Sequence, residues 1–180
     1  MVHKSVSALI DEAIWPAILI VGAKILGVFA VNFFFGNSWI LERSAFFSLP
    51  AVSYFSLEEF LLTNSLSNAL MFVVISLGTS LVIVRAHFFH ASHISPQLHA
   101  RILRLRLSIL VAETFKIYHQ ATIWLAFLWL AAVLLIFQSI FNLSSPILAI
   151  VAFLITLNFS WFLVSDIRRE VEINKKERYL

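Results

Sequence analysis

Four long runs of apolar residues, separated by shorter polar stretches, dominate the chain. They cover residues 14–35, 60–84, 121–141 and 147–165. Each run has about the 20 residues that a helix needs to cross a hydrocarbon core about 30 Å thick. The pattern therefore predicts an all-α fold, an integral membrane four-helix bundle that forms a single domain over residues 1–180.

Local signals mark where these helices begin. Ser56 and Glu59 have the spacing of a capping box, so the second helix should begin near Leu57. Proline is harmless in the first turn of a helix, where an N–H has no partner. The prolines that we expect near a helix start are Pro16, Pro96 and Pro146.

The connections differ in length and character. Residues 36–55 are rich in aromatic side chains, which favour the membrane interface, so this loop should lie on the bilayer surface. Residues 142–145 predict a tight turn between antiparallel helices. Residues 85–119 should form a helical hairpin between the second and third helices. Within it, residues 98–118 are too apolar to stand alone in water, and they either lie on the membrane or protrude and pack on protein.

Basic residues predict the orientation. Nearly all Lys and Arg fall on one side of the predicted bundle, in both tails and in loop 85–119, whereas Arg43 lies on the other side. Because cytoplasmic segments carry an excess of Lys and Arg, both termini and that loop should be cytoplasmic. The tail 166–180 is then also cytoplasmic, and the plasma (inner) membrane of the cell is the expected location.

Composition agrees with a membrane protein. Hydrophobic residues make up 61% of the 180 residues and the mean hydropathy is +0.92, whereas a soluble domain is about 45–50% apolar. The chain has no cysteine, which excludes disulfides, thiol catalysis and cysteine-based metal sites. The first run is about twice as long as the core of a signal peptide, so we expect a retained helix.

Lys24 is the one charged residue inside the predicted spans. It lies about 10 residues into its run, hence about 15 Å deep and near the midplane. A charge there costs about 2.5–3.5 kcal/mol on insertion. Three interpretations follow: an ion or proton path, a salt bridge to another subunit, or a lysine tolerated inside the bundle. Expected hydrogen-bonding partners are backbone carbonyls and Asn32, Asn68, Thr79 and Asn158.

The second helix carries a polar stripe along one face. Its members are Ser65, Asn68, Ser76, Thr79 and Ser80. Such side chains either line a path or form hydrogen bonds between helices, each worth about 0.6 kcal/mol. We favour hydrogen bonds between helices. Ala23 and Gly27 form a small-xxx-small pair, which predicts close approach of the first helix to a neighbour.

Histidines of the cytoplasmic loop are weak candidates for metal or haem ligands. His87, His90 and His93 have spacings that bring pairs of them onto one helix face. Nearby carboxylates that would orient them are missing in the local sequence, and so is a fourth ligand. We therefore expect no metal site and no cofactor.

Arginines of the same loop are candidates for contact with lipid or protein. Arg101, Arg104 and Arg106 lie close together, and each basic residue near an anionic surface contributes about 1 kcal/mol. Anionic lipid headgroups are the expected ligands, although a membrane or soluble partner would suit the same residues. Nucleic-acid binding is not expected, because no recognisable binding fold accompanies the charge.

The sequence predicts only a broad class of function. The sequence has no nucleophile–base pair, no phosphate-binding loop and no paired carboxylates in a predicted span, so an enzyme is not expected. The leading hypothesis is a non-enzymatic subunit or assembly module of a larger membrane complex, bound to other membrane subunits or to copies of itself. The alternative is a small oligomeric transporter or channel that uses Lys24 and the polar stripe.

Overall fold

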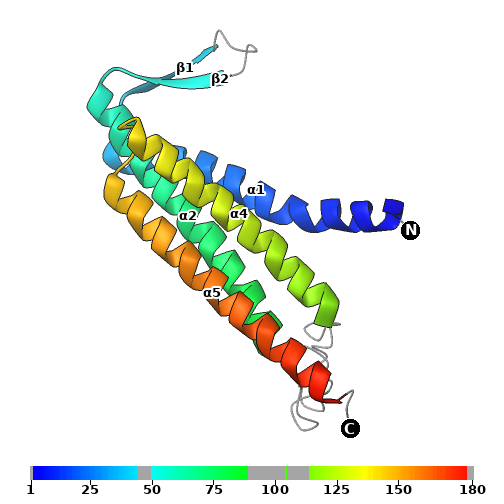
Figure 1. Ribbon diagram of the computed structural model, residues 1–180. Coiled ribbons are helices and arrows are strands. Elements are labelled where there is room, and N and C mark those ends of the chain that lie inside the picture. The colour runs from blue at the N-terminus through cyan, green and yellow to red at the C-terminus, as the bar shows by residue number, and fades with distance from the viewer. Residues whose placement is uncertain (1, 44–49, 89–103, 105–113, 178–180) are drawn as a thin grey trace.

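The computed structural model describes residues 2–43, 50–88, 104 and 114–177. Within these residues the fold consists of long helices and one β-hairpin (Figure 1). The helices are α1 (Val2–Phe35), α2 (Leu57–Phe88), α4 (Thr114–Ile140) and α5 (Pro146–Glu177). The strands are β1 (Trp39–Arg43) and β2 (Pro50–Tyr54).

Each helix contains a segment long and apolar enough to cross a membrane. These segments are Ile10–Phe35, Leu57–Phe88, Lys116–Ile140 and Pro146–Glu172. The predicted four apolar helices are therefore confirmed, and a helical bundle fits them. Most of the predicted hairpin between the second and third helices lies outside the described residues, although α2 and α4 extend into its two ends.

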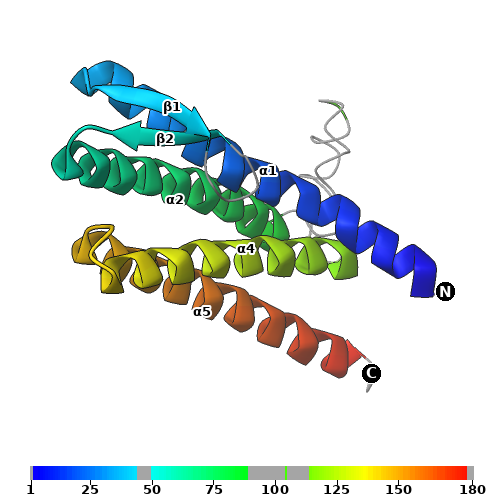
Figure 2. The same cartoon turned by 90° about the horizontal axis from the view of Figure 1, so that it is seen from above.

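The helices form a layered arrangement. Both views place α2 and α4 side by side, with α1 and α5 on opposite sides of this pair (Figures 1 and 2). Helix α1 packs mainly on α2 and also on α4, whereas α5 packs mainly on α4 and also on α2. The central pair therefore supplies most of the packing surface.

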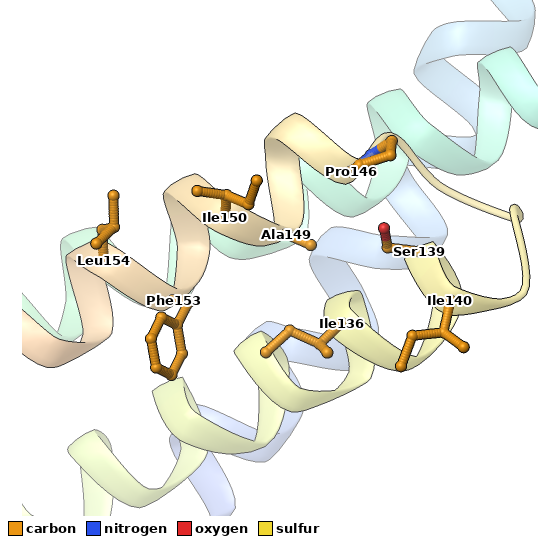
Figure 3. Close-up of a pocket in the computed structure, with 8 residues that line it drawn as sticks. All are labelled: Ile136, Ser139, Ile140, Pro146, Ala149, Ile150, Phe153 and Leu154. Carbon is orange, nitrogen blue, oxygen red and sulfur yellow. The ribbon is translucent and has the colours of Figure 1, made fainter.

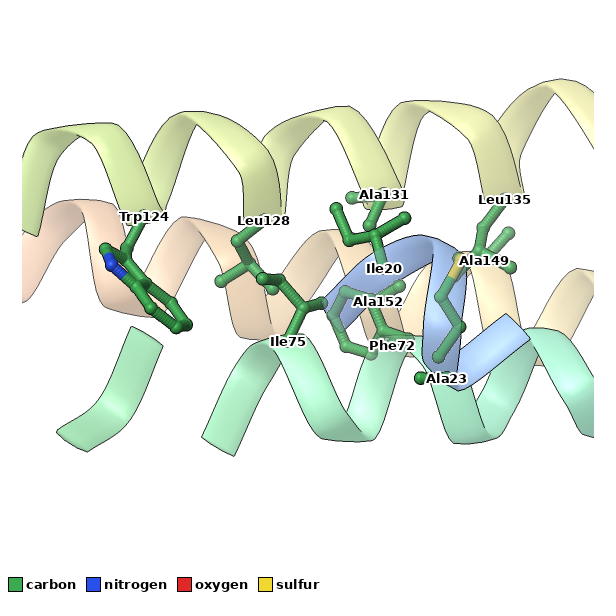
Figure 4. Close-up of a cluster of buried hydrophobic side chains, with 12 residues drawn as sticks. Ile20, Ala23, Phe72, Ile75, Trp124, Leu128, Ala131, Leu135, Ala149 and Ala152 are labelled. Atoms are coloured by element: carbon green, nitrogen blue, oxygen red, sulfur yellow. The ribbon is translucent and has the colours of Figure 1, made fainter. Parts of the chain in front are cut away.

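The core between the helices is apolar (Figure 4). Its side chains come from all four helices and include Ile20, Ala23, Phe72, Ile75, Trp124, Leu128, Ala131, Leu135, Ala149 and Ala152. The alanines of α4 and α5 let these two backbones approach closely, which gains van der Waals contact where lipid offers no hydrophobic driving force.

Two glycines lie at close helix contacts. A Cβ on Gly27 would be 2.9 Å from Cα of Ser67, so α1 sits directly on the α2 backbone there. A Cβ on Gly78 would be 2.1 Å from Cζ3 of Trp124 on α4. Gly22, by contrast, has no atom within 4 Å of such a Cβ.

Helix starts were predicted correctly at two places. Helix α2 begins at Leu57, and Ser56 Oγ accepts a hydrogen bond of 3.1 Å from the Glu59 N–H. The Glu59 carboxylate accepts from the Ser38 N–H at 3.5 Å, so only one half of the expected capping box forms. Helix α5 begins at Pro146 as expected.

The prediction for Pro16 was wrong. This residue lies inside α1, which begins already at Val2, and it is buried. Proline inside a helix removes one backbone hydrogen bond, and packing against neighbouring helices makes this tolerable. The polar residues before Pro16 continue the helix, which a proline-based boundary misses. Pro96 lies outside the described residues.

The tight turn at residues 142–145 is confirmed. Helix α4 ends in a Schellman motif, in which the Leu143 N–H donates to the Gln138 carbonyl at 2.8 Å and the Asn142 N–H to the Ser139 carbonyl at 3.0 Å. Asn142 has a φ of 55°, which asparagine tolerates better than most residues. The turn makes α4 and α5 antiparallel neighbours.

A β-hairpin in the first connection was not predicted. Strands β1 and β2 pair antiparallel, from Trp39 opposite Tyr54 to Arg43 opposite Pro50. Their aromatic and aliphatic residues favour strands, but a strand requires a partner that one segment alone does not reveal. The hairpin lies at the end of the molecule where α1 ends and α2 begins (Figure 1).

Candidate functional site

Lys24 is held by a group of oxygen atoms from α2. Its Nζ donates to Asn64 Oδ1 at 2.8 Å, to Ser67 Oγ at 2.8 Å and to Asn68 Oδ1 at 2.6 Å. The Asn64 backbone carbonyl lies 3.3 Å from the same atom. We call these four oxygens the Lys24 cage.

The cage forms because its residues share one face of a helix. Asn64, Ser67 and Asn68 have i, i+3 and i+4 spacing, so their side chains project from the same side of α2. Gly27 follows Lys24 by about one turn and lets α1 rest on the backbone of Ser67. The close contact brings the lysine amine within reach of all these oxygens.

Gln138 fixes the orientation of both amides. Its Oε1 accepts from Asn64 Nδ2 at 3.1 Å and from Asn68 Nδ2. Asn64 Nδ2 also donates to the Leu143 carbonyl at 2.6 Å. Because both amide nitrogens point at these acceptors, both amide oxygens face the ammonium. The cage therefore links α1, α2 and the end of α4.

The cage lies at the middle of the apolar segment of α1 but near the end of α4. Lys24 is central in the segment Ile10–Phe35, as expected. Gln138, however, belongs to the last turn of α4, and Leu143 to the turn that follows. Helix α1 crosses the other helices at an angle in Figure 1, so a residue central in α1 meets the end of α4. The amine thus lies nearer the hairpin end than residue counting places it.

The expected partners of Lys24 are only partly those in the structure. Asn68 is in the cage, but Thr79 donates to the Ile75 carbonyl of its own helix at 2.9 Å. Asn158 likewise donates to its own helix, at the Leu154 carbonyl. Asn64 and Ser67 were missed as partners, and so was Gln138, which accepts from the two asparagine amides. The i, i+3 and i+4 spacing of Asn64, Ser67 and Asn68 was the available signal. The predicted stripe contained Ser65 instead of Asn64 and Ser67.

The predicted polar stripe on α2 does not form a continuous path. Asn68 and Thr79 are buried, and Phe72 and Ile75 between them belong to the apolar core. The buried Ser76 hydroxyl has no hydrogen-bond partner among the described residues. The remaining members of the stripe, Ser65 and Ser80, are half-buried.

A second polar cluster joins the helices to the hairpin. Asn32 Nδ2 donates to the Tyr54 hydroxyl at 3.0 Å, and Thr63 Oγ1 donates to Asn32 Oδ1 at 3.0 Å. Asn37 Nδ2 donates to Thr63 Oγ1 at 2.9 Å. Asn32 and Thr63 are buried. The cluster docks β2 on α1 and α2.

A third cluster lies at the opposite end of the helices. Asp166 of α5 has one carboxylate oxygen 2.8 Å from His87 Nδ1 and accepts a 2.8 Å hydrogen bond from the Tyr118 hydroxyl on the other. The sequence analysis found no orienting carboxylate near His87, because Asp166 is distant in sequence. We call these three residues the Asp166 cluster; it joins α2, α4 and α5.

The Asp166 cluster gives a testable prediction. Asp166→Ala should lower the free energy of unfolding by about 1–3 kcal/mol, because it leaves a partly buried hydroxyl and an imidazole without their acceptor. Thermal unfolding in detergent measures this, with Glu172→Ala, an exposed carboxylate on the same helix, as the control. Equal effects of the two substitutions would contradict the role of Asp166.

Only some of the candidate metal ligands and lipid contacts lie in the described part of the chain. No group of three or more His, Asp or Glu side chains there is placed to hold a metal ion. His90 and His93 lie outside the described residues, as do Arg101 and Arg106. Arg104 is exposed. The expected lipid or partner contacts of these arginines stay a prediction.

A groove between α4 and α5 has an almost entirely apolar lining (Figure 3). It has a volume of about 450 Å³ and is lined by Ile136, Ser139, Ile140, Pro146, Ala149, Ile150, Phe153 and Leu154. The Ser139 hydroxyl is the polar side-chain group in this lining. The groove suits a hydrocarbon chain or an apolar side chain.

Comparison of the chain with models of protein families, with curated proteins and with solved structures found no match. The functional argument therefore depends on the fold and on the polar clusters.

Proposed function

We propose that this chain spans the cell membrane four times and serves as a non-enzymatic subunit or assembly module of a larger membrane complex. The observation that carries this proposal is the exposed apolar surface, to which every helix contributes large side chains. The Lys24 ammonium is satisfied within the chain by neutral oxygens, so we assign the cage a structural role in holding α1 against α2 and the end of α4.

The distribution of polar groups supports a structural role. The Lys24 cage and the Asp166 cluster lie toward opposite ends of the helices, and the side chains between them form the apolar core of Figure 4. A transport path through a single chain would need polar groups or water along this route. Among the described residues, the core is mainly apolar, and the buried hydroxyls of Thr79 and Thr156 donate to carbonyls of their own helices.

The outer surface supports contact with lipid and with partner helices. Large apolar side chains are exposed on every helix, such as Trp15 on α1, Leu81 on α2, Phe137 on α4 and Trp161 on α5. A soluble protein rarely exposes apolar patches of this extent. In a bilayer, such a surface is stable against hydrocarbon and is also available to apolar helices of other subunits.

The test of this proposal is the composition of the particle in mild detergent. Native mass spectrometry of the chain purified from its own membranes should give a mass well above 20.5 kDa, with a second chain in fixed stoichiometry. Lys24→Met should retain that chain, because the cage satisfies the ammonium internally. A monomer in every mild detergent and in nanodiscs would contradict the proposal.

The alternative is a small oligomeric transporter or channel. The favouring observation is that four oxygens converge on one cation inside an apolar helix pair, as they do in ion sites. A homo-oligomer in the same mass measurement favours this alternative. Reconstituted Lys24→Met should then lose flux while assembly stays intact.

A further inference from the structure

We propose that the Lys24 cage is a binding site for a monovalent cation of ammonium size, which this chain fills with its own Lys24 side chain. The lysine is a tethered ligand, and the oxygens of α2 form a site that exists independently of the tether. This inference goes beyond the proposed function and does not depend on it.

The charge of the cage selects a monovalent cation. All four contacts to Nζ come from neutral amide, hydroxyl and backbone oxygens, and no described carboxylate joins them. Divalent cations in proteins are bound mainly through carboxylates, at about 2.3–2.6 Å for Ca²⁺ and about 2.0–2.1 Å for Mg²⁺. The cage distances of 2.6–3.3 Å are those of N–H···O hydrogen bonds. They fit an ammonium group.

Contacts other than those to Lys24 orient the cage oxygens. Ser67 and Asn68 are fully buried on α2. Gln138 accepts from both asparagine amides, and the Leu143 carbonyl accepts from Asn64. These bonds point Oδ1 of both asparagines at one place without any help from Lys24. A site whose oxygens are already oriented by other partners needs little rearrangement to take a separate cation.

Chemical rescue with a free amine tests whether the cage binds a cation that is not attached to α1. Lys24→Ala removes Cγ, Cδ, Cε and Nζ, which are the heavy atoms of n-propylammonium. The variant should bind n-propylammonium chloride in the space left between α1 and α2. At about 100 times its Kd, a ligand should raise the Tm of a chain of this size by about 5–10 °C.

The expected result is a saturable rise in Tm of Lys24→Ala with n-propylammonium and none with tetramethylammonium, which cannot donate a hydrogen bond. The wild type should not respond, because its site is full. Asn68→Leu added to Lys24→Ala should abolish the response. Equal shifts with both salts, or an unchanged shift in the double variant, would overturn the proposal.

A second variant keeps the test decisive if Lys24→Ala is poorly folded. Lys24→Val retains the stem only up to Cγ and leaves space for a shorter amine, so methylammonium chloride should stabilise it more than tetramethylammonium chloride does. If neither variant is folded alone, extraction in n-propylammonium must recover folded Lys24→Ala. Failure of both rescues would overturn the cation site.

Discussion

Replacing Asn68 with leucine is expected to lower the free energy of unfolding by about 3 kcal/mol, whereas Lys24→Met should lower it by less. Asn68 Oδ1 forms the shortest contact to Nζ, at 2.6 Å. Its loss leaves a half-buried ammonium under-solvated and removes a donor from Gln138. Lys24→Met leaves the cage oxygens without their donor, but it also removes the charge and its desolvation cost, so the two effects partly offset each other.

Two comparisons make this prediction specific. Asn158→Leu is the matched control, because Asn158 is exposed and donates only to its own helix at 3.4 Å; its effect should be small. The double variant Lys24→Met/Asn68→Leu should be more stable than Asn68→Leu alone, which shows coupling. Thermal unfolding in one detergent compares the stability of these four variants with that of the wild type. Equal losses in Asn68→Leu and Asn158→Leu would contradict the role of the cage.

Replacing Gly78 with leucine is expected to lower the free energy of unfolding by about 3 kcal/mol or to prevent folding. Even a Cβ would be 2.1 Å from Cζ3 of Trp124 and 3.0 Å from Cη2. Trp124 is buried in the core together with Ile75 and Leu128, so the ring has little room to move. Overpacking of this kind typically costs about 1–3 kcal/mol per site, and leucine adds more atoms than alanine.

Gly22 provides the control for this prediction. A Cβ there meets nothing within 4 Å, so Gly22→Leu should be tolerated, as glycine is the poorer helix former. Gly78→Ala combined with Trp124→Leu should be more stable than Gly78→Ala alone, because the smaller side chain relieves the clash. Expression and thermal unfolding measure these differences. A folded Gly78→Leu with wild-type stability would show that α2 and α4 are not in close contact at this point.

The features that the sequence predicted correctly are those set by local signals. The four helices follow from runs of apolar residues, because each run alone is long enough for a span. The start of α2 at Leu57 follows from Ser56, and the start of α5 follows from Pro146. The turn at 142–145 follows from the lack of residues for anything longer.

The features that were missed depend on contacts between distant segments. Asn64 and Ser67 reach Lys24 because Gly27 sets how α1 rests on α2, and no pattern within α2 alone gives this rotation. Gln138 joins the cage only through the packing of α2 on α4. Asp166 reaches His87 in the same manner. The β-hairpin, too, requires each strand to find a partner.

The most direct measurement is labelling of single cysteines with a membrane-impermeant thiol reagent in intact cells. The chain has no native cysteine, so Arg43→Cys in the hairpin and Lys175→Cys near the end of α5 report on one position each. The proposed four-span topology predicts labelling of Arg43→Cys from outside and of Lys175→Cys only after permeabilisation. Labelling of both positions from the same side would contradict it.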